Sequence, residues 1–86
     1  MFGNLYLFLD QMAFEDAVLE VTTKDGDIFT GQSAGEDLGE ENMAWSFKKV
    51  QNWEYDGLFL KNIARVRRVG ETEYAYIAED ELAVAS

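Results

Sequence analysis

The chain has 86 residues, of which 48% are hydrophobic and 14% aromatic, enough for one domain with a single modest core. It has no cysteine and no histidine, which excludes disulfides, thiol nucleophiles and the usual imidazole bases and zinc ligands. A net charge of −10 argues against unspecific nucleic-acid binding, because such binding relies on cations that displace counterions from phosphates.

The charge is unevenly distributed along the chain. Segment 48–68 carries six basic residues against Glu54 and Asp56, a net charge of +4, so the rest of the chain carries −14. Two interpretations stay open for this segment. It is either a set of solvated strand faces and edges or a local site for an anion or a partner.

The sequence shows no sign of a membrane segment or of a domain boundary. No apolar run approaches the roughly 20 residues of a membrane span, and the N-terminus lacks the basic region and cleavage site of a signal peptide. Proline and low-complexity runs are absent too. We therefore expect one continuous domain over 1–86, cytoplasmic, with no membrane partner.

Near the N-terminus, apolar residues predict a short amphipathic helix over 4–13. Leu5, Phe8, Leu9 and Met12 follow the i, i+3, i+4, i+7 spacing of one helix face. Asn4 precedes them as the expected N-cap. A strand over the same apolar letters is the alternative.

Two alternating runs, 17–23 and 27–34, predict strands joined by a tight turn. Asp25-Gly26 between them is typical of a type I′ hairpin, which needs positive φ at both central residues. Gly31 lies inside the second strand on its inward face, where glycine usually marks a bulge or a sharp bend. Two strands that must curl within so few residues favour a small closed barrel.

Three further runs predict strands at 42–50, 53–60 and 62–69. The second is expected to break near Asp56-Gly57. The third also fits helical spacing, and a strand is favoured because a fifth strand closes the barrel, which would then span 17–69. Residues 70–86 are a C-terminal extension that could add one short strand before an acidic tail.

Four aromatic residues in these runs are assigned roles by alternation. Trp45 and Phe47 point the same way and are expected in the core. Trp53 and Tyr55 lie in the charge-rich segment, where both a core role and an interface or stacking role remain open.

Two stretches resemble the motifs of Sm and Sm-like (LSm) proteins. "LEVTTKDGDIFTGQSAGEDLGEENM" resembles the first Sm motif, and "LFLKNIARV" resembles a degenerate second motif. The residues that match the first motif are Lys24, Asp25, Gly26, Phe29, Gly31 and Asp37. A divergent member, such as a phage-encoded one, would fit this sequence.

The resemblance implies a fold, an assembly and a ligand. The fold is all-β, a small, strongly bent five-stranded Sm-like (SH3-like) barrel with a short N-terminal α-helix. The subunits would form a homo-oligomeric ring by pairing the fourth strand of one with the fifth of its neighbour. Single-stranded RNA would lie near the pore, at Asp37 and Asn42 of the first motif and at Lys61 and Asn62, which replace the Arg-Gly pair of the second.

The sequence departs from the family at this RNA site. Asn42 follows Asp37 by five residues instead of four, and the loop offers no flat side chain to stack a base. Stacking is worth about 1–3 kcal/mol per base, so we expect weak RNA binding. The alternative for all four residues is ordinary loop and turn chemistry.

Two functions are therefore expected. One is an Sm-like ring that binds single-stranded RNA weakly. The other is a ring that acts as a structural or protein-interaction module without RNA. No nucleophile, base or cofactor motif is recognisable, so we expect neither an enzyme nor a cofactor.

Overall fold

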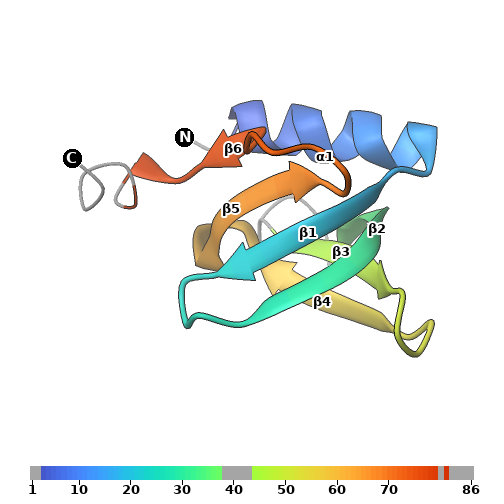
Figure 1. The fold of residues 1–86 in the computed structure, drawn as a ribbon. Helices are drawn as coiled ribbons and strands as arrows, with labels where there is room; N and C mark the ends of the chain where they lie inside the picture. Colours follow the sequence, from blue (N-terminus) through green and yellow to red (C-terminus); the bar gives the residue numbers. More distant parts are fainter. Residues whose placement is uncertain (1–2, 38–43, 80, 82–86) are drawn as a thin grey trace.

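The computed structural model describes residues 3–37, 44–79 and 81, in which an N-terminal α-helix precedes an antiparallel sheet (Figure 1). The sheet has six strands in the order β4-β3-β2-β1-β5-β6. In chain order the elements are α1 (Gly3–Glu15), β1 (Val18–Thr23), β2 (Ile28–Asp37), β3 (Ala44–Lys49), β4 (Tyr55–Phe59), the 3₁₀ helix η2 (Leu60–Asn62), β5 (Ile63–Arg68) and β6 (Tyr76–Ile77).

The N-terminal segment is helical, as its apolar spacing predicts, and not a strand. Leu5, Leu9 and Met12 are buried, and α1 lies along one side of the sheet (Figure 1). The predicted N-cap is wrong, because the helix begins at Gly3 and Asn4 lies within its first turn. Within the described part of the chain, no helix is long and apolar enough to cross a membrane.

The turn between β1 and β2 differs from the predicted type I′ turn. Gly26 N donates to Thr23 O at 3.0 Å, and Thr23 N donates to Asp27 O at 2.8 Å. Gly26 has a φ of 95°, whereas Asp25 is not among the described residues with positive φ. This is a three-residue hairpin loop, a type I turn closed by a left-handed glycine. Only one position therefore requires glycine.

Gly31 lies where β3 comes close to β2. A Cβ at this position would lie 2.9 Å from the backbone oxygen of Lys48. The bulge itself comes later in β2, where the register with β3 shifts between Ser33 and Gly35 and Gly35 has a φ of 120°. The predicted bend in this strand thus separates into a close approach at Gly31 and a bulge at Gly35.

The sheet is open, so the predicted closed five-stranded barrel is wrong. β4 and β6 are the two ends of the sheet, and η2 connects β4 to β5. The segment at 62–69 is a strand, as favoured, but it is not an edge, because β6 from the predicted C-terminal extension pairs with it at Arg65 and Val66. β4 runs through Asp56-Gly57 without the expected break.

The core lies between α1 and the sheet. Its buried members come from the helix, from η2 and from three strands, and Trp45 and Phe47 are among them as predicted: Leu5, Leu9, Met12, Leu19, Val21, Trp45, Phe47, Leu60, Ile63 and Val66. Two buried hydrogen bonds cross it. Trp45 Nε1 donates to Ser33 Oγ at 2.6 Å, and Ser33 Oγ donates to Leu9 O at 2.7 Å. The helix, β2 and β3 are therefore joined by polar contacts as well as by apolar packing.

Candidate functional site

Three of the four predicted RNA-binding residues, Asp37, Lys61 and Asn62, lie around the ends of β2 and β4. Asp37 is the last residue of β2, and its backbone lies opposite Ala44, which in turn lies opposite Phe59. These three positions form one row across β2, β3 and β4. Asn42 lies outside the described residues.

Lys61 and Asn62 follow this row in η2, and both are exposed. Lys61 Nζ lies 5.7 Å from the centre of the Phe59 ring. The backbone oxygen of Asn62 accepts a hydrogen bond from Lys24 N at 2.8 Å, which ties η2 to the turn between β1 and β2. The predicted pair is therefore held on a fixed backbone and faces solvent.

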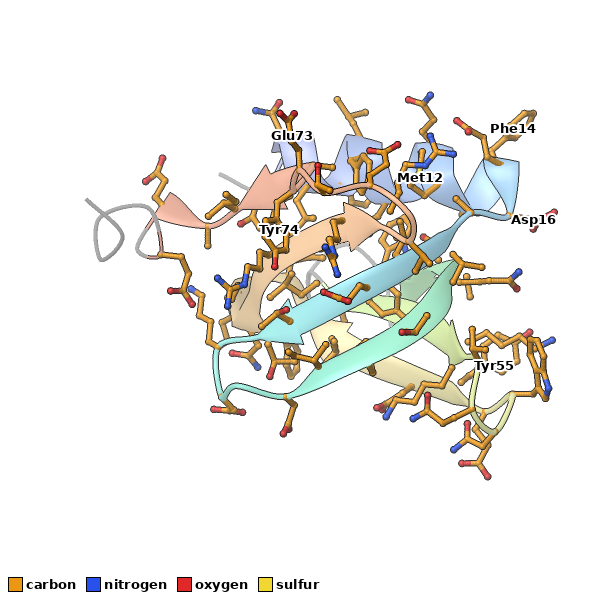
Figure 2. All side chains as sticks on the ribbon, in the orientation of Figure 1. Met12, Phe14, Asp16, Tyr55, Glu73 and Tyr74 are labelled. Carbon is orange, nitrogen blue, oxygen red and sulfur yellow. The ribbon has the colours of Figure 1, made fainter. Side chains whose placement is uncertain are left out.

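A strip of exposed aromatic rings and lysines lies beside η2 on the outer face of β4. We name Lys48, Trp53, Tyr55, Phe59 and Lys61 the β4 strip. Its three rings are exposed by 59%, 66% and 44% in chain order. Tyr55, labelled in Figure 2, projects from the end of the sheet into solvent.

Alternation along β4 places Tyr55 and Phe59 on one face. Tyr55 lies opposite Lys48 on β3. Phe59 lies four residues further along β4, opposite Ala44, and its side chain is on the same face. Lys48 Nζ lies 5.4 Å from the Trp53 ring and 5.8 Å from the Tyr55 ring. The core role left open for Trp53 and Tyr55 is thus excluded. Phe59 and Lys48 could have been found from the same alternation.

The other face of β4 borders an open, mostly polar hollow. Within it, Lys49 Nζ lies 3.0 Å from Asp56 Oδ2 and 5.2 Å from the centre of the Phe29 ring. The residues that line the hollow come from four strands and two turns: Thr23, Asp27, Ile28, Phe29, Lys49, Gln51, Asp56 and Leu58. Because its lysine is already paired with Asp56, the hollow offers little free charge to a ligand.

A second cation-aromatic cluster lies on the outer face of β5. The Tyr74 ring is 5.4 Å from the guanidinium carbon of Arg65 and 5.8 Å from that of Arg67 (Tyr74 is labelled in Figure 2). Arg67 donates to both carboxylate oxygens of Glu20, at 3.1 and 2.9 Å. The hydrogen bond and charge of Glu20 raise the pKa of Arg67 above its ordinary value. Within the described residues, Arg65 Nε is buried without a hydrogen-bond partner.

The described residues contain no group of three or more acidic side chains that could hold a metal ion. The chain matches no protein-family model and no curated protein. The function must therefore be inferred from the surface itself.

Proposed function

We propose that the protein is a divergent Sm-like protein that binds single-stranded RNA weakly through the β4 strip and the adjoining η2. The observation that carries this proposal is the strip itself, with three exposed aromatic rings on β4 and on the turn before it, each beside a lysine. Proteins that bind single strands without strict sequence preference combine aromatic platforms for the bases with cations for the backbone.

The strip supplies what the first-motif loop lacks. The family's stacking residue has no counterpart in "LGEE". Trp53 and Tyr55 offer flat rings beside Lys48, and Phe59 offers one beside Lys61. The strip belongs to the segment with a net charge of +4. At physiological ionic strength the Debye length is about 8 Å, so this local charge acts despite the acidic remainder of the chain.

The arrangement of the elements supports the Sm-like resemblance. A helix precedes five antiparallel strands, each paired with the next along the chain up to β4, and β5 returns to β1. The same resemblance implies RNA contacts at Asp37, Asn42, Lys61 and Asn62. The β4 strip extends that proposed site along the neighbouring strand.

Titration of a fluorescently labelled oligouridylate tests the proposal. We expect Tyr55→Ala to weaken binding about 5- to 150-fold, since one lost stacking contact is worth about 1–3 kcal/mol. Tyr74→Ala removes the same ring from the other cluster and is the matched control, with expected binding within about twofold of wild type. Equal losses in both variants, or no binding of wild type at low salt, would contradict the proposal.

A protein-interaction module is the second candidate, and the position of β4 favours it. β4 is an edge strand of the sheet, and an edge strand presents unpaired backbone groups with which another strand can form hydrogen bonds. If wild type fails to bind RNA in the titration, this function takes precedence.

A further inference from the structure

The ladder between β3 and β4 identifies which backbone groups of β4 point outward. Lys49 N donates to Glu54 O at 2.9 Å, so these two residues form a hydrogen-bonded pair of the ladder. Such pairs alternate along antiparallel strands. The backbone groups of Asp56 and Leu58 therefore point to β3, whereas those of Tyr55 and Gly57 and the N–H of Phe59 point away from it. The carbonyl of Phe59 begins η2 as its N-cap and accepts the first hydrogen bond of that helix.

The edge of β5 is less available than the edge of β4. A ring that joined β4 to the β5 of a neighbour would need the side of β5 that faces away from β1. β6 lies there, opposite Arg65 and Val66, and Ala78 N also donates to Ala64 O at 2.8 Å. Such a ring could close only if residues 76–78 detached from β5.

The edge of β4 is complementary to a second copy of itself. In an antiparallel pairing centred on Gly57, Tyr55 lies opposite the partner's Phe59, and Gly57 lies opposite the partner's Gly57. This is the register that pairs all three outward residues with outward residues. Any other register that sets outward-pointing residues opposite each other leaves at least one of these three residues without a partner.

The side chains also fit this register. Each Tyr55 meets a Phe59 across the junction, and aromatic cross-strand pairs stabilise antiparallel sheets. Because Gly57 has no side chain, the Tyr55 and Phe59 rings of the two copies can pack over the centre of the junction. Within β4, no like charges lie directly opposite each other in this register.

We propose that the protein forms a two-fold symmetric dimer in which β4 pairs antiparallel with the β4 of a second copy, centred on Gly57. The two sheets become one continuous sheet with a closed, isologous junction. Two β4 strips then lie side by side on one face. The dimer follows from the edge geometry and does not depend on RNA binding.

Single cysteines test this register, because the chain has no cysteine of its own. Residues opposite each other in a hydrogen-bonded pair have Cα atoms about 5.5 Å apart, within the span of a disulfide. We expect Gly57→Cys to form a disulfide-linked dimer on mild oxidation, and to react with a short bis-maleimide. Tyr55→Cys is the matched control. Its two copies would lie about 13 Å apart along the strands and should stay unlinked.

Light scattering at tens of micromolar completes the test, without RNA. We expect the wild-type mass to be that of a dimer and Gly57→Pro to be a monomer with an unchanged circular dichroism spectrum. Proline removes only an N–H that points away from β3, which an edge strand tolerates. A wild-type monomer, a larger ring, a dimeric Gly57→Pro or linkage of Tyr55→Cys would each overturn the dimer.

Discussion

Ser33 is the residue through which the helix and two strands share polar contacts. Its hydroxyl accepts from the Trp45 indole and donates to the carbonyl of Leu9 inside the core. Alternation along the strand predicts that Ser33 faces inward, but the sequence does not identify its partners. Leu9 is 24 residues away in the chain, and only the docking of α1 brings it to Ser33.

Loss of this hydroxyl should be costly. Ser33→Ala leaves the buried indole N–H of Trp45 without its acceptor, and an unsatisfied buried donor costs about 1–3 kcal/mol. Urea unfolding measures this as a lower free energy of unfolding. Ser46→Ala, on the opposite face of β3, is the control and should change that energy by less than about 0.5 kcal/mol. Equal effects of the two changes would mean that the buried hydrogen bonds add nothing to stability.

Gly31 is required for space and not for its conformation. In Gly31→Val the new Cβ would meet the backbone oxygen of Lys48 at 2.9 Å, and backbone cannot move aside as a side chain can. We expect a loss of about 1–3 kcal/mol in the free energy of unfolding, typical of overpacking. Thr30→Val, one residue earlier in β2, should be neutral or slightly stabilising because valine favours strands. An unchanged melting temperature for Gly31→Val would contradict the close approach.

At the scale of elements, local pairings could be predicted and distant ones could not. The β1–β2 hairpin is encoded by two neighbouring runs of alternating residues and by a glycine in the turn between them. The bounds of both strands were therefore predicted to within a few residues. The pairing of β6 with β5 joins Ile77 to Arg65 across a loop, and no local pattern encodes it. The closed barrel failed for the same reason, since closure depends on which edges remain free.

The short β6 should control whether β5 is available for assembly. Ala78→Pro removes the N–H that bonds to Ala64 O and should detach this segment, exposing the edge of β5. We expect the variant to form species larger than the wild type as its concentration rises, because open edges pair with one another. Thr72→Pro, in the exposed loop before β6, is the proline control. Light scattering that shows identical masses for all three proteins would argue against this role.

At the scale of the whole molecule, the sequence located the basic segment but not its surface. The charge count predicts a local positive region, and Lys61 was named from its motif position. The β4 strip emerges only when β3 and β4 are paired, because that pairing sets Lys48 beside Tyr55. Asp37 and Lys61 are likewise brought toward each other by the row through Ala44 and Phe59.

The overall acidity predicts a shallow salt dependence for RNA binding. If Lys48 and Lys61 each contact one phosphate, the slope of log affinity against log salt should be about −1.4, at about −0.7 per contact on a single strand. Lys61→Ala should reduce the slope by about 0.7. Titrations at several salt concentrations measure both values. A slope steeper than about −3 would point to a broader basic surface than the strip.

The two tryptophans occupy opposite environments, which gives the protein two separate optical reporters. Trp45 is 1% exposed with its indole N–H bonded inside the core, whereas Trp53 is 59% exposed on the β4 strip. Indole emission shifts to longer wavelength in water, so the red part of the spectrum belongs mainly to Trp53 and the blue part to Trp45. An external quencher such as acrylamide should reach the first and spare the second. Events at the strip and loss of the core can therefore be followed independently in one unlabelled sample.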